Sequence, residues 1–186
     1  DWQFRQLFSA TMIFCFSSIA DKKDKDKMKK LIGYMGGNFS NSLTESTTHL
    51  LTTDLFSKKY YFAGEHGMKI MDPIFIEEMW RLSRQNKFNK HADDPDFIES
   101  YGLKVFNKLV FCSTRLDIAE KKEIILKVES FGGIYSPTFK TSTVKVLLMR
   151  AKDINCEKHK VAVRHHIHCI DPKWLDDAIM KGYSIN

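Results

Sequence analysis

The chain has 186 residues, a length that suits one large domain or two small ones. Hydrophobic residues make up 43% of it and charged residues 28%, which is typical of a globular protein with a core and excludes disorder for most of the chain. The sequence contains no run of 18 apolar residues, so it predicts no membrane-spanning helix, and we expect no membrane partner. The net charge of +6 favours an acidic partner without identifying it.

The positive charge divides evenly along the chain. Residues 1–93 carry 14 Lys or Arg against 11 Asp or Glu, and residues 94–186 carry 15 against 12, a net of +3 in each half. A basic tail on a neutral body would concentrate the charge in one part. The even division of charge is typical of a sequence with an internal repeat.

The cysteines give the redox compartment. None of the four shows the C-x-x-C spacing of a metal or redox motif, so we interpret them as reduced thiols of a cytosolic or nuclear protein (Cys15, Cys112, Cys156 and Cys169).

The predicted elements of the first half begin with a strand. Its apolar run, residues 12–19, includes the hydroxyl residues Ser17 and Ser18, as expected where a buried strand meets a loop. The glycines at 36–37 suit the left-handed conformation that ends a helix. Before them, apolar residues recur at i, i+4 and i+7 and predict an amphipathic helix (Met28, Ile32 and Met35).

The rest of the first half contains further strands and helices. Residues 48–51 are predicted as a strand, and a second helix begins near Lys59. Asp72 and Pro73 open a last helix, because proline is favoured at the first helical position.

The second half repeats these features. Residues 109–116 predict a strand, and a helical stripe precedes the glycines at 132–133 (Ile124, Val128 and Phe131). A strand is predicted at 144–147, opening 11 residues after the second glycine, as the strand at 48 does in the first half. Asp171 and Pro172 open the last helix.

The two copies also agree in their later spacings. Lys59 precedes Asp72 by 13 residues, and Lys158 precedes Asp171 by 13 residues. Each copy is therefore predicted as β-α-β-β-α-β-α, an α/β fold with a small parallel sheet of four strands flanked by helices. We expect an N-terminal extension, a first repeat, a linker and a second repeat (1–8, 9–83, 84–102 and 103–186).

The combined motifs resemble the BRCT domain, in tandem over nearly the whole chain. They are the glycine pair after the first helix, the Thr-His-Leu strand at 48–50, Lys59-Tyr60 with Ala63, and a proline with Trp174 in the last helix. Residues 57–60 and the segment 158–169 are similar to the topoisomerase II-binding scaffold family of replication and checkpoint proteins.

Several positions depart from the BRCT pattern. Phe75 stands where tryptophan is usual, Arg115 where glycine is usual, and His159 follows the second lysine. Residues 144–146 stand at the predicted position of the Thr-His-Leu strand and differ from it. The tandem region of a Rho guanine-nucleotide exchange factor, which shares the Met-Gly-Gly motif, and a DNA-binding BRCT module are the alternatives.

The resemblance implies two sites for phosphoserine or phosphothreonine peptides. A phosphate carries nearly two negative charges and needs hydroxyl or amide donors and a cation. The resemblance assigns these roles to the hydroxyl, the following main-chain N–H and a lysine at the start of a helix, in each repeat (Ser17, Ser18 and Lys59; Thr114, Arg115 and Lys158).

Other candidate features have simpler interpretations. The basic run 22–30 would suit DNA or a nuclear import signal, but aspartates interrupt it and favour a solvated helix face. The segment 165–169 holds zinc-ligand residue types on an expected strand, without a second ligand cluster. The paired carboxylates 77–78 and 176–177 repeat at equivalent helix positions and do not indicate an enzyme.

We therefore expect a nuclear, non-catalytic and monomeric module that forms part of a larger protein. Its partners would be phosphorylated peptides, with DNA as a weaker alternative. No cofactor and no metal are expected.

Overall fold

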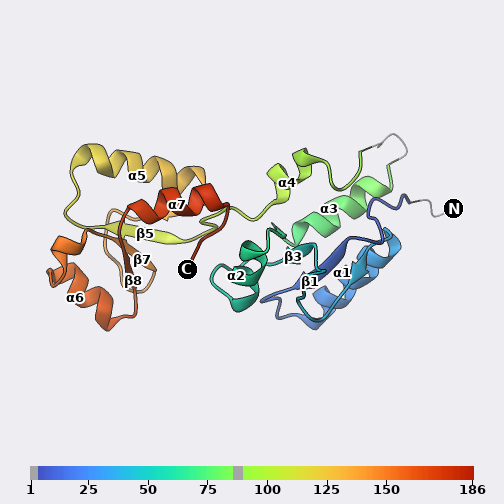
Figure 1. Ribbon diagram of the computed structural model, residues 1–186, viewed down its shortest axis with the longest axis horizontal. Helices are drawn as coiled ribbons and strands as arrows, with labels where there is room; N and C mark the ends of the chain where they lie inside the picture. The colour runs from blue at the N-terminus through green and yellow to red at the C-terminus, as the bar shows by residue number, and fades with distance from the viewer. Residues whose placement is uncertain (1–3, 86–89) are drawn as a thin grey trace. The chain divides into compact units, whose positions relative to one another are not determined.

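A computed structural model describes residues 4–85 and 90–186 and divides the chain into two units, residues up to 103 and residues 104–185 (Figure 1). The expected N-terminal extension and linker therefore lie only partly within the described residues. Among these residues, no helix has the length and apolar character needed to cross a membrane.

The first unit follows the predicted order of elements. It contains β1 (Ile13–Phe16), α1 (Lys22–Tyr34), β2 (Asn38–Phe39), β3 (His49–Leu51), α2 (Lys58–Glu65), β4 (Lys69–Met71), α3 (Ile74–Ser83) and α4 (Pro95–Tyr101). The four strands form a parallel sheet in the order β2-β1-β3-β4, with Cys15 opposite Leu50 and Leu50 opposite Ile70. This confirms the predicted α/β architecture.

Alternation along the strands builds three layers in this unit (Figure 1). Phe14 and Phe16 of β1 join the core beneath α1 and α3, whereas Cys15 packs with Leu50 and Ala63 beneath α2. Successive side chains of a strand point to opposite faces, so an unbroken apolar run is buried on both sides. Because both faces of the sheet are covered, the strand ends and the adjoining loops are the parts of it that can form a binding site.

The segment from residue 90 to 102 packs onto the first unit. Ala92 and Phe97 are buried in its core, and a bridge joins Met71 to Gly102. Near the other end, Leu7 and Phe8 are also buried there. The described parts of the expected linker and extension are therefore packed elements of this unit.

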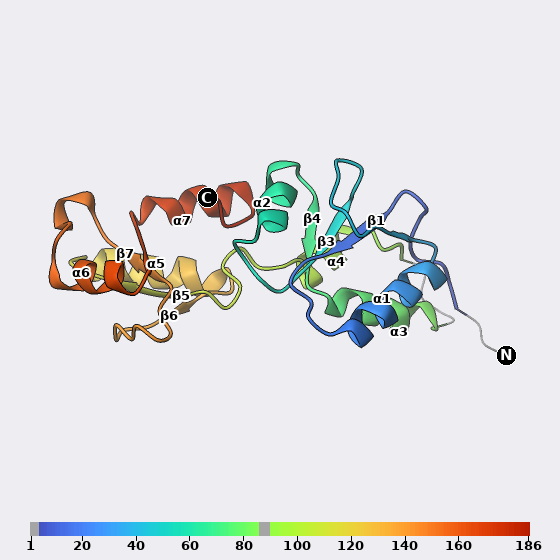
Figure 2. The ribbon, with the colours of Figure 1, turned by 90° about the horizontal axis from the view of Figure 1, so that it is seen from below.

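The second unit repeats the arrangement. It contains β5 (Val110–Ser113), α5 (Ile118–Ser130), β6 (Ile134–Tyr135), β7 (Val146–Leu148), the 3₁₀ helix η1 (Ala151–Asp153), α6 (Glu157–Arg164), β8 (His168–Ile170) and α7 (Lys173–Lys181). Its parallel sheet has the order β6-β5-β7-β8. Figure 2 shows α5 and α7 with this sheet after a quarter turn.

The glycine pairs end α1 and α5 as predicted. Gly36 has a φ of 95° and Gly132 a φ of 85°, both in the left-handed region. The amide of Gly37 then donates to the carbonyl of Ile32, a hydrogen bond of 3.0 Å that closes the last turn of α1.

The predicted equivalence of two strands was wrong by one residue. Phe14 lies opposite His49 in the first sheet, and Phe111 lies opposite Val146 in the second. The counterpart of Thr48 is therefore Lys145, not Val144. The loop between β6 and β7 contains one additional residue, which a fixed spacing from the glycines does not detect.

Candidate functional site

In both units the first strand ends beside the N-terminus of a helix. Ser17 follows β1, and its amide donates to the carbonyl of Leu51 at 3.1 Å. Thr114 follows β5, and its amide donates to the carbonyl of Leu148, also at 3.1 Å. These matching bonds fix both hydroxyl residues at the carboxyl edge of the sheet. This edge is where ligands commonly bind in open parallel sheets.

Two hydroxyl groups meet at the end of β1, in a group of residues that we call the first cluster (Ser17, Ser18, Ser57 and Lys59); its counterpart at the end of β5 is the second cluster (Thr114, Arg115, Cys156 and Lys158). The hydroxyl oxygens of Ser17 and Ser57 lie 3.2 Å apart. Ser57 is the N-cap of α2 and accepts a hydrogen bond of 3.0 Å from the amide of Tyr60. The cap therefore places a second hydroxyl beside Ser17, which is 7% exposed. Ser57 is not among the predicted site residues, although a serine before a helix is a known capping signal.

The predicted lysine lies at the same place. The ammonium group of Lys59 donates to the carbonyl oxygen of Phe16 at 2.8 Å and contacts the sulfur of Cys15 at 3.5 Å. Since Phe16 immediately precedes Ser17, these contacts hold the cation beside the hydroxyl pair. An ammonium group has three protons to donate, so it can bind an anion while keeping its bond to the carbonyl.

The residue after the hydroxyl has an unusual backbone conformation. Ser18 has a φ of 58° and Arg115 a φ of 54°, both in the left-handed region. Within the described ranges, neither main-chain amide has a hydrogen-bond partner. The structure thus brings together all three groups predicted for the first site, including an amide available to a ligand.

The second cluster has the same framework. The ammonium group of Lys158 donates to the carbonyl oxygen of Ser113 at 3.2 Å, just before Thr114. Thr114 is 9% exposed. The predicted residues Thr114, Arg115 and Lys158 therefore lie around the end of β5, as their counterparts do around the end of β1.

The two clusters differ at the helix cap. Cys156 is the N-cap of α6, where its sulfur accepts a hydrogen bond of 3.4 Å from the amide of His159. A thiol stands where the first unit has the hydroxyl of Ser57. The second cluster consequently has one hydroxyl fewer to offer a phosphate.

A buried carboxylate accompanies the second cluster only. Asp153, at the end of η1, has a side chain that is 8% exposed and lies 3.5 Å from a guanidinium nitrogen of Arg115. Its other oxygen, Oδ2, has no hydrogen-bond partner within residues 4–85 and 90–186. No sequence pattern indicated this residue, because burial of a carboxylate depends on tertiary packing.

A groove of about 390 Å³ lies next to the first cluster. Ser18 lines it, together with Ile19 and Met28 and with Ile74 at the start of α3. The exposed ion pair between Lys27 and Glu77, at 3.0 Å, links α1 to α3 along it.

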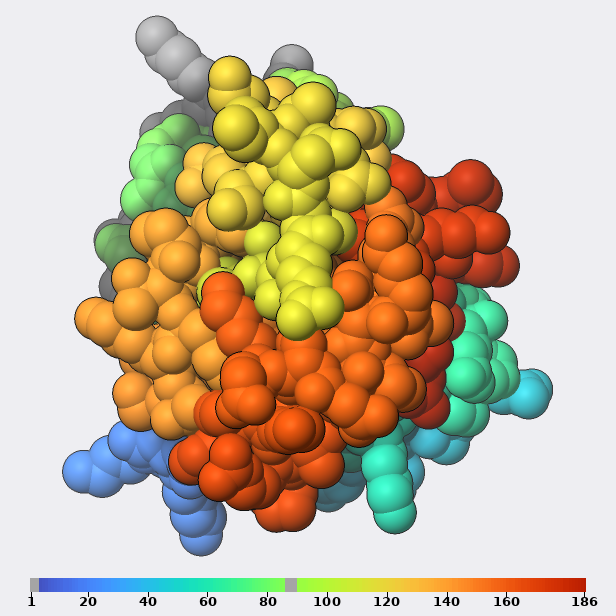
Figure 3. All heavy atoms as spheres, turned by 90° about the vertical axis from the view of Figure 1, so that its left-hand side faces the viewer, coloured from blue at the N-terminus to red at the C-terminus, as the bar shows by residue number. Residues whose placement is uncertain are grey.

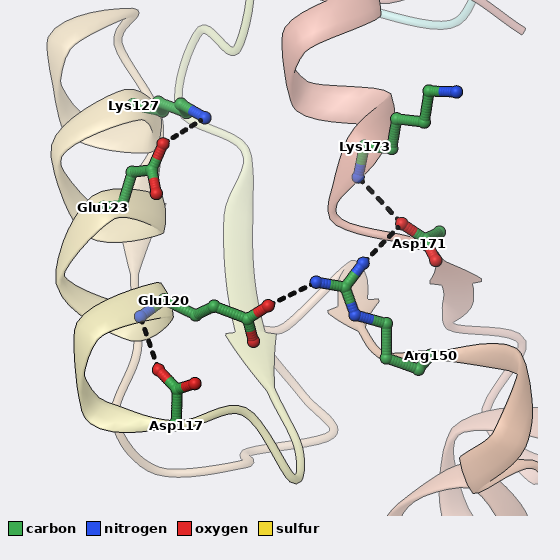
Figure 4. A network of polar contacts seen from close by, with 7 residues as sticks. All are labelled: Asp117, Glu120, Glu123, Lys127, Arg150, Asp171 and Lys173. Carbon is green, nitrogen blue, oxygen red and sulfur yellow. Dashed lines mark hydrogen bonds and ion pairs between the residues drawn. The ribbon is translucent and has the colours of Figure 1, made fainter.

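The equivalent groove of the second unit has a volume of about 310 Å³, and every polar residue that lines it is charged. Arg150 bonds Glu120 of α5 and, at 3.2 Å, Asp171 before α7 (Figure 4). Lys127 pairs with Asp176 at 2.9 Å. This network ties α5 to α7, whereas the groove of the first unit has the ion pair between Lys27 and Glu77 and a mixed apolar and polar lining.

Three of the four paired carboxylates noted in the sequence take part in such contacts. Glu77 pairs with Lys27, Glu78 with Arg81, and Asp176 with Lys127. Each of these carboxylates therefore has a structural partner on a helix surface.

The structure also places the other two candidate motifs, the basic run and the histidine-rich segment. The basic run lies on α1, capped by Asp21, whose carboxylate accepts from the amide of Lys23. His168 lies on β8, whereas His165 and His166 lie at the end of α6, so the expectation of one strand was wrong for these two. No group of three or more His, Cys, Asp or Glu residues suited to a metal ion occurs among residues 4–85 and 90–186.

Comparison with protein families gives two matches. Residues 12–75 match the family model of the twin BRCT domain, and residues 102–179 match that of the BRCA1 C Terminus (BRCT) domain.

Individual relatives are consistent with these two family matches. The S-M checkpoint control protein rad4 of Schizosaccharomyces pombe is 24% identical over 172 residues, which is 91% of this chain and 26% of the relative. The chain thus spans about a quarter of that protein. Two crystal structures of Rad4 BRCT1,2, with a Crb2 and with an Mdb1 phosphopeptide, are 22% identical and have TM-scores of 0.84 and 0.87. Each match covers 97% of this chain and 96% of the other, and shows that the fold is shared.

Proposed function

Because the chain belongs to the BRCT family, with two such domains in tandem, we propose that it is a phosphopeptide-binding scaffold module. It recruits proteins phosphorylated on serine or threonine in DNA replication or in the DNA-damage checkpoint. BRCT domains are protein-interaction modules, and we propose no catalysis, cofactor or metal. The solved relatives Rad4 BRCT1,2 hold phosphopeptides, and the related checkpoint control protein gives the cellular context. We propose a nuclear location, which is in keeping with that context.

The observation that carries this proposal is the convergence of three kinds of donor at the end of β1. A hydroxyl pair and the ammonium group of Lys59 come from a strand end and a helix start. The main-chain amide of Ser18 lies at the same strand end and has no hydrogen-bond partner among the described residues. The helix N-terminus adds a dipole that favours an anion. Charge-assisted hydrogen bonds contribute about 1.5–3 kcal/mol each, so three of them with a few peptide contacts give roughly micromolar affinity.

The second unit offers a related set of donors at the end of β5. Thr114, the amide of Arg115 and Lys158 supply the hydroxyl, the N–H and the cation. A partner phosphorylated at two sites would gain affinity if it engaged both pockets, because the second binding step is then intramolecular.

The proposal is tested with a degenerate library of phosphothreonine peptides, its unphosphorylated counterpart and a duplex DNA. We expect the chain to retain phosphorylated peptides only, and the double variant Lys59→Glu/Lys158→Glu to retain none. Equal retention of both peptide libraries contradicts the proposal. DNA binding with a steep salt dependence and no phosphopeptide preference would favour the DNA-binding alternative.

The matched control reverses neighbouring charges. Lys58→Glu/Lys160→Glu changes the net charge equally, and both of these lysines are exposed. The control variant should retain phosphopeptides. Amide spectra of all variants check that the fold is intact.

A further inference from the structure

The two pockets differ at the residue that follows the hydroxyl. Ser18 in the first unit and Arg115 in the second share the left-handed conformation, with φ values of 58° and 54°. In the first unit this residue offers an amide and a small hydroxyl. In the second it also carries a guanidinium group, which has five N–H donors and no acceptor.

The structure shows what holds this guanidinium. A nitrogen of Arg115 lies 3.5 Å from Oδ1 of Asp153. The main-chain carbonyl of Asp153 accepts from the amide of Cys156 at 3.1 Å, and Cys156 caps the helix that carries Lys158. The contact therefore directs Arg115 from the end of β5 toward the loop that enters α6.

The space-filling view agrees with this contact. In Figure 3 the yellow segment that joins β5 to α5 lies against the orange segment between β7 and α6. The guanidinium belongs to a side chain that is 62% exposed, whereas the carboxylate is only 8% exposed. The cation is thus accessible to a ligand while its anchor is buried.

A buried carboxylate without enough partners is costly, because it has lost its solvation by water. Oδ2 of Asp153 has no hydrogen-bond partner among the described residues, and Arg115 forms an ion pair with the other oxygen, Oδ1. The equivalent residue before α2 is Asp54, which is exposed. The second unit thus has both a buried aspartate, Asp153, and an arginine beside it, whereas the first unit has neither at the equivalent positions.

We propose that Arg115 is a second phosphate-binding cation of the second pocket and that Asp153 is the positioning residue that holds it there. This inference rests on the proposed function. It makes the two pockets chemically different: the first binds phosphate through a hydroxyl pair and one cation, and the second through one hydroxyl and two cations.

The test is a titration of the ¹⁵N-labelled chain with inorganic phosphate, read at the amides of Ser18 and Arg115. The two signals report the two pockets separately in one sample. In Arg115→Ser, read at the amide of residue 115, we expect about tenfold weaker binding at the second pocket, because one charge-assisted contact is lost. Binding read at Ser18 should not change.

Arg115→Lys separates charge from geometry. It keeps the cation but not the planar fork, so we expect it to recover part of the lost affinity. Unchanged or tighter binding in Arg115→Ser overturns the proposal, since the arginine is then neutral or obstructive.

Asp153→Asn tests the positioning role. We expect about threefold weaker binding in the wild-type background, and no further weakening when it is added to Arg115→Ser, because Asp153 acts through the arginine. Weakening by the same factor in both backgrounds contradicts this role.

The outcomes also separate this inference from the proposed function. If Lys158→Glu abolishes phosphate binding at Arg115 but Arg115→Ser has no effect, only the inference fails. If neither variant alters the titration, the second pocket itself is wrong.

Discussion

The ammonium group of Lys59 donates a hydrogen bond of 2.8 Å to the main-chain carbonyl of Phe16, the last residue of β1. Lys158 makes the same contact with Ser113, the last residue of β5, at 3.2 Å. A lysine at the start of a helix is thus tied to the end of the central strand in both repeats. This bond holds a flexible side chain beside the hydroxyl, so less conformational entropy is lost when a phosphate binds.

Substitutions at Ser57 should separate capping from ligand binding. Ser57→Ala removes the N-cap of α2 and should lower the free energy of unfolding of the first unit by about 1 kcal/mol. Ser57→Asp keeps a good cap but places a carboxylate where the hydroxyl lies 3.2 Å from that of Ser17. We expect it to retain stability and to lose phosphate binding at the first pocket.

Hydrogen exchange of the β1 and β3 amides measures the stability of the Ser57 variants, and the phosphate titration read at Ser18 measures binding. Phosphate binding as tight in Ser57→Asp as in the wild type would show that the hydroxyl pair does not face the ligand.

His49 should make the first unit sensitive to acid. Burial, and secondarily the nearby charge of Lys69, lowers the pKa of His49 from 6.5 to about 4. The folded state therefore binds this proton less readily than the unfolded state, so the stabilisation is complete above pH 6.5 and is lost as the pH falls toward 4. The loss is on the order of 3 kcal/mol.

Val146 occupies the equivalent strand position in the second unit and suggests the control His49→Val. This variant should lose much of the difference in unfolding free energy between pH 7 and pH 4. An unchanged pH profile would show that other groups cause the acid sensitivity.

Two glycines of the first unit should respond oppositely to alanine. A Cβ at Gly36 would lie 2.8 Å from the carbonyl oxygen of Phe8, and its φ of 95° disfavours any side chain. Gly36→Ala should therefore destabilise the unit by about 2 kcal/mol. Gly33 lies in the exposed part of α1 with no atom within 4 Å of such a Cβ, so Gly33→Ala should stabilise it by about 0.5–1 kcal/mol.

Urea denaturation of both variants gives the comparison. A stabilising effect of Gly36→Ala would mean that the helix end does not require the left-handed conformation.

Much of the fold is local enough to be predicted from the sequence. The stripe that contains Met28 and Ile32, followed by Gly36, specifies an amphipathic helix and its end, and both are confirmed. The repeat of this pattern predicted two units with parallel sheets. The position of the strand that contains Val146 was missed by one residue, because a loop insertion leaves no periodic signal.

The site shows the same limit. Ser17 and Lys59 are 42 positions apart, yet the resemblance to the BRCT domain placed them at a strand end and a helix start, where the structure has them. Asp153 could not be predicted, because an acidic residue between a strand and a helix is usually solvated, and only packing buries this one. Assignment of phosphate binding to these residues remains a prediction.

The most direct test of the central claim is isothermal titration of a phosphothreonine peptide selected from the library against the single variants Lys59→Glu and Lys158→Glu. The peptide identifies its own pocket: we expect the cognate variant to bind about a hundredfold more weakly, and the other variant and both controls, Lys58→Glu and Lys160→Glu, to bind as the wild type does. Wild-type affinity in both Lys59→Glu and Lys158→Glu, with the fold intact, would contradict the account.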